Sequence, residues 1–330
     1  MLTSADLRGL YAIIPTPARP GAEAITATNT VDLDETERLV TNLLQDGASG
    51  LIVLGTTGEC ATLTDADYDR FVDCVCRVVD RQVPLFVGAT ALGGQAAFRR
   101  LSFAREQGAD GSLLGMPMWQ PMTTDMALKY YAEVSEALPS LAIMVYANAR
   151  AFRYDFPLEF WQALIKVAPT VISAKYSRAQ GLANLIEATE RRINFMPIDM
   201  SVADFYEASP ETTTACWATA AAMGPEPAAL VIDAALQGDA ARVKALDAEI
   251  AWSNEPIMDL LAQPDIFASY NIQIEKIRIA TAGYCRPGPI RSPYNSIPEE
   301  YAEAARECGR RWIELRKRLG SAPAVAARAG

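Results

Sequence analysis

The sequence contains no histidine among its 330 residues. Histidine is the commonest general base and the commonest metal ligand in proteins. Its absence argues against triad hydrolases, zinc lyases and H-E-x-x-H metalloenzymes. Any proton transfer by this chain must therefore use tyrosine, lysine, a carboxylate or water.

The sequence also lacks a cysteine pattern typical of metal binding. No C-x-x-C pair occurs, and Cys74 and Cys76 stand two apart in a helical stretch, where they face different directions. We predict no metal site, and we expect most cysteines to be buried as small apolar side chains. The six cysteines occupy positions 60, 74, 76, 216, 285 and 308.

Targeting segments and basic clusters are missing as well. The N-terminus, residues 1–6, has neither the basic nor the apolar region of a signal peptide. No apolar run approaches the ~20 residues that span a bilayer. The net charge is −10 and no block of lysines or arginines occurs, which argues against nucleic acid or a membrane as a partner. We expect a cytoplasmic protein that acts on a small molecule.

Short apolar runs alternate with amphipathic stretches along most of the chain. This alternation predicts a (β/α)8 TIM barrel. An open doubly wound sheet is the alternative, but Pro15-Thr16-Pro17 follows the first strand where a G-x-G-x-x-G turn would be expected. The predicted strands cover 10–14, 50–54, 84–87, 111–114, 142–146, 171–175, 194–197 and 213–217. The predicted helices between them lie near 33–46, 65–80, 95–107, 124–138, 157–167, 180–190 and 202–208.

The pattern changes after Trp217, because about 100 residues of helical periodicity follow without a convincing strand. Helices are predicted over 226–237, 239–262, 268–282 and 298–318. We predict that the barrel covers residues 1–237, that a helical C-terminal extension covers 238–319, and that 320–330 form a flexible tail.

Lys175 ends the apolar run 171–174, which is a predicted buried strand. The side chain at the carboxyl end of a barrel strand points into the site that the barrel encloses. A poorly solvated lysine loses part of its preference for the charged form and becomes an amine nucleophile toward ketones. A single lysine after a strand is more often a solvated loop residue, so this interpretation depends on its neighbours.

Other strand ends bring further groups to the same edge. The second strand ends in Gly55-Thr56-Thr57-Gly58-Glu59, a turn whose backbone N–H groups and hydroxyls suit a carboxylate or phosphate, or which simply caps the next helix. Tyr146 ends the fifth strand, where it either packs or moves a proton. Polar or aromatic side chains at Asn148, Trp119 and Trp217 complete the edge.

Together these groups supply an amine, a carboxylate cradle and a phenol. The constellation resembles the pyruvate-dependent class I aldolase family, the group of dihydrodipicolinate synthase and N-acetylneuraminate lyase, over residues 8–300. The motifs that carry the resemblance are Gly55-Thr-Thr-Gly-Glu59, Gly115-x-Pro117, Tyr146, Lys175 and Gly288-Pro-Ile-Arg-Ser-Pro293. The resemblance implies a Schiff base on Lys175, Tyr146 as proton carrier, the turn of Gly55, Thr56 and Thr57 around a pyruvyl carboxylate, no cofactor, and a homotetramer.

Within this family the chain is most similar to the hydratase-aldolase branch that cleaves benzylidenepyruvates. Met118 and Trp119 replace the two tyrosines of the dihydrodipicolinate synthase branch, which argues against a role in lysine biosynthesis. The motifs of this likeness are Gly55–Leu63, Pro117-Met-Trp119, Tyr146-Ala-Asn148, Phe152-x-x-Asp-Phe-Pro157, Ala174-Lys-Tyr176, Tyr270-Asn-Ile272 and Pro293-Tyr-Asn295. The likeness implies that Trp119, Asn148, Trp217 and Asn271 line the aryl and water side of the pocket.

The implied reaction is cleavage of an ortho-substituted trans-benzylidenepyruvate to an aromatic aldehyde and pyruvate, in the degradation of polycyclic aromatic hydrocarbons. Arg150, Arg153 and Arg178 lie close to strand ends and favour the 2'-carboxy substrate, which gives 2-carboxybenzaldehyde. The alternatives are the o-hydroxy substrate, which gives salicylaldehyde, a class I aldolase or dehydratase of a sugar acid, and a non-catalytic barrel that binds a 2-oxo acid.

Overall fold

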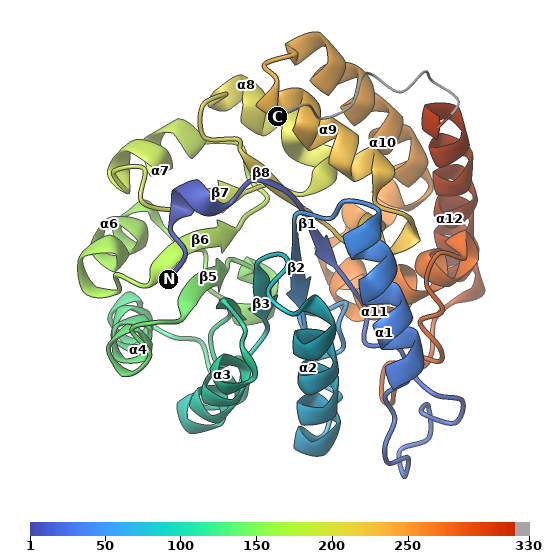
Figure 1. Cartoon of the computed structure of the whole chain (residues 1–330), viewed down its shortest axis with the longest axis horizontal. Helices are drawn as coiled ribbons and strands as arrows, with labels where there is room; N and C mark the ends of the chain where they lie inside the picture. The colour runs from blue at the N-terminus through green and yellow to red at the C-terminus, as the bar shows by residue number, and fades with distance from the viewer. Residues whose placement is uncertain (321–330) are drawn as a thin grey trace.

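The computed structural model describes residues 1–320, with the exception of the Pro264 side chain. Its eight parallel strands form a barrel, which confirms the predicted fold (Figure 1). Neighbouring strands are hydrogen-bonded in the order β7-β6-β5-β4-β3-β2-β1-β8. The strands are β1 (Gly9–Ile13), β2 (Gly50–Val53), β3 (Leu85–Val87), β4 (Gly111–Leu114), β5 (Ala142–Tyr146), β6 (Val171–Lys175), β7 (Asn194–Met196) and β8 (Ala215–Ala218).

The barrel strands are apolar because helices cover them outside and side chains fill them inside. Every residue of the eight strands is buried except Lys175, which is half-buried. Between β7 and β8 the ring is closed by a parallel bridge between Ile198 and Trp217, where the Trp217 N–H donates to the Pro197 carbonyl oxygen at 2.8 Å. This bridge places Trp217 beside the end of β7.

Helices alternate with the strands and surround the barrel (Figure 1). Side chains cap the starts of α1, α2 and α4; for example, the Thr64 hydroxyl before α2 accepts a hydrogen bond from the Asp67 N–H at 3.2 Å. The surrounding helices are α1 (Leu33–Gln45), α2 (Asp65–Val79), α3 (Gly94–Gln107), α4 (Thr124–Ala137), α6 (Leu158–Val167), α7 (Leu182–Ala188), α8 (Val202–Ala208) and α9 (Glu226–Leu236). Short helical turns are η1 (Ser4–Asp6), α5 (Ala149–Phe152), η2 (Asp199–Ser201) and η3 (Ala220–Met223).

Three long helices follow the barrel: α10 (Ala240–Leu261), α11 (Pro264–Ala282) and α12 (Glu299–Gly320). α11 begins four residues before the predicted position 268, because a proline is accepted in the first turn of a helix. The division predicted after residue 237 falls between α9 and α10, which pack against each other. Val243 of α10 and Trp312 of α12 share an apolar cluster with barrel residues such as Leu10. Of the predicted tail, residues 321–330 lie outside the described part of the chain.

Among residues 1–320, no helix combines the length and the apolar character needed to cross a bilayer.

A buried ionic cluster joins the loop after β2 to the C-terminal helices. The Glu59 carboxylate is fully buried and receives hydrogen bonds from Lys276 Nζ at 2.8 Å and Arg291 Nη1 at 2.6 Å. Its second oxygen accepts the Arg291 backbone N–H at 2.9 Å. Arg291 also donates from Nε to the Thr30 hydroxyl at 2.8 Å. Glu59 is thus an anchor between the barrel and the extension.

The same loop depends on a close backbone approach. A Cβ atom at Gly58 would stand 2.7 Å from the backbone N and Cα of Leu54, so only glycine fits here. The Thr16 hydroxyl donates to the Gly58 carbonyl oxygen at 2.8 Å and holds the turn from the first strand. The turn that carries Thr56 and Thr57 is therefore fixed on two sides.

We expect Glu59→Gln to lower the free energy of unfolding by about 3 kcal/mol, because it leaves two buried cations without a compensating anion. Urea-induced unfolding measures this loss. Glu37→Gln is the control, because Glu37 pairs with Arg77 at 3.0 Å on the exposed surface, where a pair contributes at most about 1 kcal/mol. Equal stabilities of the two variants would contradict the anchoring role.

Candidate active site

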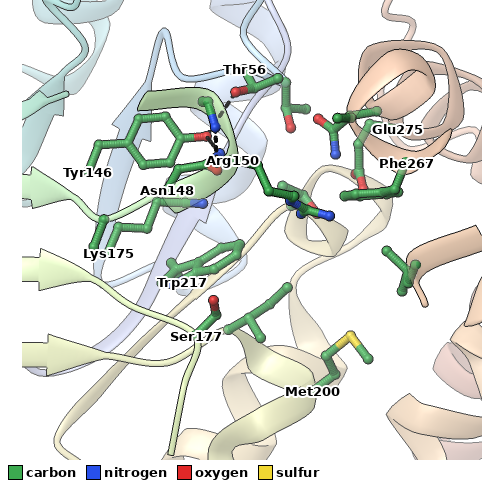
Figure 2. Close-up of a pocket in the computed structure, with 18 of the residues that line it drawn as sticks. Thr56, Tyr146, Asn148, Arg150, Lys175, Ser177, Met200, Trp217, Phe267 and Glu275 are labelled. Carbon is green, nitrogen blue, oxygen red and sulfur yellow. Dashed lines mark hydrogen bonds between the residues drawn. The ribbon is translucent and has the colours of Figure 1, made fainter. Parts of the chain in front are cut away.

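A cavity of about 530 Å³ opens at the carboxyl ends of the strands. One wall comes from the barrel, through the loop after β2 and the ends of β5, β6 and β8, and the opposite wall comes from α10 and α11. Figure 2 shows Tyr146 and Lys175 on one side and Phe267 and Glu275 on the other, with Arg150 between them. This is the face at which a (β/α)8 barrel carries its chemistry.

The Lys175 amine lies between two aromatic faces. Its Nζ atom is 3.4 Å from the centre of the Trp217 ring and 4.8 Å from the centre of the Tyr146 ring. Burial among these rings lowers the pKa of Lys175 to about 7, although the negative charge of Glu275 opposes the shift. A large fraction of Lys175 is therefore uncharged near neutral pH, as an amine nucleophile requires.

The Tyr146 hydroxyl is held next to the β2 turn. It lies 2.8 Å from the Thr56 hydroxyl and accepts the Asn148 amide N–H at 3.4 Å (Figure 2). Burial raises the pKa of Tyr146, and the hydrogen bonds from Thr56 and Asn148 oppose this only in part. The phenol therefore stays protonated at neutral pH. Tyr146 pairs with Lys175 across β5 and β6, which explains their proximity.

The structure brings most of the predicted site residues together. Seven of the nine line the cavity: Thr56, Thr57, Tyr146, Asn148, Lys175, Trp217 and Asn271. Gly55 does not line it; its carbonyl oxygen accepts the Cys60 N–H at 3.3 Å within the turn. Trp217 lines the cavity with its ring against the Lys175 amine.

Trp119 differs from the prediction, because it does not line the cavity and is 77% exposed. Arg153 donates from Nη2 to the carbonyl oxygens of Met118 and Trp119, each at 2.7 Å. These bonds hold the loop between β4 and α4 against the end of α5. Within a single chain, Trp119 therefore lies outside the cavity in which the aryl group was expected to bind.

The wall formed by α11 contains residues that the sequence analysis missed. Phe267, Asn271, Glu275 and Arg278 all line the cavity, whereas only Asn271 was predicted. Their spacing of four, four and three residues places them on one face of the helix, and this periodicity was a usable signal. The Arg150 guanidinium stacks 5.0 Å from the centre of the Phe267 ring and links the two walls.

Comparisons with known proteins agree with this geometry. The model of the dihydrodipicolinate synthetase family matches residues 23–308. The trans-O-hydroxybenzylidenepyruvate hydratase-aldolase of Pseudomonas putida is 38% identical over 95% of both chains. The trans-2'-carboxybenzalpyruvate hydratase-aldolase of Nocardioides sp. strain KP7 is 36% identical over 96% of both chains.

A solved structure described as PhdJ bound to a substrate intermediate superposes with a TM-score of 0.91 at 33% identity, over 96% of this chain and 98% of that one. The 4-hydroxy-tetrahydrodipicolinate synthase of Methylacidiphilum fumariolicum SolV superposes with a TM-score of 0.82 at 19% identity, over 95% of this chain and 98% of that one. The second likeness concerns the fold alone.

We expect acylation of Lys175 in the folded protein to rise with pH through a midpoint near 7, because only the neutral amine reacts. Peptide mapping by mass spectrometry after brief treatment with an acylating reagent measures the midpoint. The same peptide in the denatured chain is the control, since the ordinary value of 10.5 applies there. A midpoint near 10 in the folded protein would show that the amine is well solvated.

Proposed function

Because the chain belongs to the dihydrodipicolinate synthetase family, we propose that it cleaves an ortho-substituted trans-benzylidenepyruvate to an aromatic aldehyde and pyruvate. The chain is an enzyme of the carbon–carbon lyase class, as its relatives named hydratase-aldolases are 36–38% identical over at least 95% of its length. Such a reaction fits the degradation of polycyclic aromatic hydrocarbons.

The observation that carries the proposal is the pair of Lys175 and Tyr146 at the cavity wall. In the proposed mechanism, the neutral Lys175 amine attacks the C2 ketone of the substrate, and loss of water gives an iminium ion. The turn with Thr56 and Thr57 holds the neighbouring carboxylate through hydroxyl and backbone N–H donors. The iminium serves as the electron sink, so the proposal includes no metal or organic cofactor.

Hydration and cleavage follow on the same lysine. Conjugation with the iminium makes the benzylic carbon, C4, electrophilic, and a water oriented by Asn148 and Asn271 adds there to give a neutral enamine. The proton that the water loses is returned to C3, which restores the iminium. Tyr146 then relays the proton of the new hydroxyl, giving up its own proton as it accepts this one. The electron pair of the breaking C3–C4 bond passes to the iminium and gives an enamine, whose C3 takes up the relayed proton. The aldehyde leaves, and hydrolysis of the remaining iminium releases pyruvate and free Lys175.

Two arginines at the cavity support the 2'-carboxy substrate and thus 2-carboxybenzaldehyde as the aldehyde. Arg150 and Arg178 line the cavity, whereas Arg153 is engaged by the loop after β4. Arg150 over Phe267 offers a cation next to an apolar ring, which suits a benzoate. The o-hydroxy substrate, which gives salicylaldehyde, is the second candidate, because the Pseudomonas putida relative is 38% identical.

The remaining alternatives have less support. The cavity includes Ile198, Met200, Ile257 and Leu261, which offer no side-chain hydrogen bonds to the hydroxyls of a sugar acid. A non-catalytic barrel would not require the Lys175–Tyr146 pair. The predictions of a homotetramer and of a cytoplasmic location remain predictions. The same holds for a small aryl 2-oxo acid as the partner and for the division of the chain into barrel, extension and tail.

We expect borohydride to trap a reduced pyruvyl adduct on Lys175, and Lys175→Ala to lose at least about 1,000-fold in kcat, because within residues 1–320 Lys175 is the one lysine that lines the cavity. Mass spectrometry of the intact chain and its peptides identifies the adduct. Lys129→Ala is the control, since Lys129 lies exposed on α4. An adduct elsewhere, or appreciable turnover by Lys175→Ala, would contradict the mechanism.

We expect the wild-type enzyme to prefer the 2'-carboxy substrate, and Arg150→Met to lower kcat/KM for it by about tenfold through loss of a charge-assisted hydrogen bond. The o-hydroxy compound is the internal control and should change less than about threefold in the same variant. Steady-state kinetics on both compounds measures the difference. A clear wild-type preference for the o-hydroxy compound would contradict the carboxylate assignment.

A further inference from the structure

Glu275 of α11 is the one acidic residue that lines the cavity within the described chain. We propose that its carboxylate accepts the proton of the water that adds to the benzylic carbon and returns this proton to C3. The inference rests on the proposed function, because it assigns a group to the hydration step of that reaction. Figure 2 shows Glu275 on the wall opposite Lys175 and Tyr146. In the proposed mechanism the substrate is bound to Lys175 and extends from there toward this wall.

A buried guanidinium holds the Glu275 carboxylate in place. Arg278 reaches Oε2 of Glu275 with Nε at 3.0 Å and with Nη2 at 2.9 Å. Its remaining bonds go to the Asn254 amide oxygen at 2.7 Å and to the Thr219 hydroxyl at 2.7 Å. All three nitrogens of Arg278 are thus engaged, so this arginine orients Glu275 and has little capacity left for a substrate carboxylate.

The other carboxylate oxygen is available to a water molecule. Oε1 of Glu275 receives no hydrogen bond from any residue within 1–320, although Oε2 is bound by Arg278. Asn271 precedes Glu275 by four residues and lines the same cavity, so an amide and a free carboxylate oxygen stand one helical turn apart. Such a pair can hold one water between them. The charge of Glu275 also acts on Lys175, whose pKa it raises against the effect of burial.

The other cavity groups are less suited to accept the proton. The Tyr146 hydroxyl is bound to Thr56 and Asn148 on the barrel wall and already serves the cleavage step, in which it gives up its own proton as it accepts another. Lys175 is consumed as the iminium. Asn148 and Asn271 carry amides, which orient water but do not take up a proton. Because the chain has no histidine, a carboxylate is the remaining base at this wall.

The proposed step conserves atoms and charge. The water oxygen forms a bond to C4, the C3=C4 electron pair moves to C2–C3, and the C2=N pair moves to nitrogen, which gives a neutral enamine. The water proton passes to Oε1 of Glu275. Glu275 then protonates C3 and restores the iminium. Hydroxide thus ends on C4 and the proton on C3, and both Glu275 and Lys175 return to their starting charge.

The test measures the rates of hydration and of cleavage separately in the variant Glu275→Gln. This substitution keeps a hydrogen-bond acceptor for Arg278 but removes the basic carboxylate. We expect kcat for the unsaturated substrate to fall at least about 100-fold, and cleavage of the preformed 4-aryl-4-hydroxy-2-oxobutanoate to change less than about threefold. Loss of the absorbance of the benzylidenepyruvate measures the first rate, and aldehyde release measures the second. An equal loss in both steps, or normal hydration, would overturn the inference.

Three controls keep these outcomes distinct. Glu35→Gln alters another buried glutamate with arginine partners, at 2.7 Å from Arg38 Nε, but away from the cavity, and should leave both rates unchanged. If Glu275→Gln alone unfolds, Glu275→Gln with Arg278→Gln removes both buried charges together and should show the same selective loss. If the wild type does not consume the unsaturated substrate, the proposed function itself is contradicted. If the wild type turns over normally and Glu275→Gln hydrates the substrate at the same rate, only the role of Glu275 is contradicted.

Discussion

The buried contact between Glu59 and Lys276 determines how the extension faces the barrel. Lys276 occupies α11 and reaches Glu59 at 2.8 Å, while Arg291 reaches the same carboxylate at 2.6 Å from the segment after α11. Adjacent residues of an α-helix point about 100° apart. With Lys276 committed to the barrel loop, Glu275 turns toward the cavity, and Asn271 lies on the same face one turn earlier. The ionic cluster, together with the packing of Ile274 against α12, thus orients the helix that forms one wall of the site.

Such a cluster contributes more to geometry than to net stability. The cost of removing charges from water can match or exceed their attraction, so a buried ion pair is weak evidence for stabilisation. The cluster fixes the position of the β2 turn relative to α11, because Glu59 belongs to the same turn as Thr56 and Thr57. The turn of Thr56 and Thr57 and helix α11 therefore meet through the buried contact of Glu59 with Lys276. A second buried arginine, Arg278, repeats this arrangement inside the cavity with Glu275, Asn254 and Thr219.

The two walls of the cavity have different chemical character. The barrel wall places an amine between the rings of Trp217 and Tyr146, where poor solvation lowers the pKa of Lys175 to about 7. The extension wall combines an apolar ring, an amide and an arginine-bound carboxylate at Phe267, Asn271 and Glu275. In the mechanism proposed for this chain without histidine, amine, phenol and carboxylate divide the work of nucleophile, proton carrier and base. This division suits a reaction in which water must add before a carbon–carbon bond breaks.

The sequence by itself determined the elements and the barrel wall. Apolar periodicity located the ends of all eight strands to within two residues. Parallel strands place their carboxyl ends on one face, so Lys175, Tyr146 and the turn of Thr56 and Thr57 were found from local pattern. The extension wall was not, apart from Asn271. Which face of α11 meets the cavity depends on Glu59, a residue 217 positions from Lys276. The exposed position of Trp119 and the contact of Trp217 with Lys175 were not predictable for a related reason. The path of a loop and the closure between β7 and β8 are decided by long-range contacts, which one-dimensional periodicity does not contain.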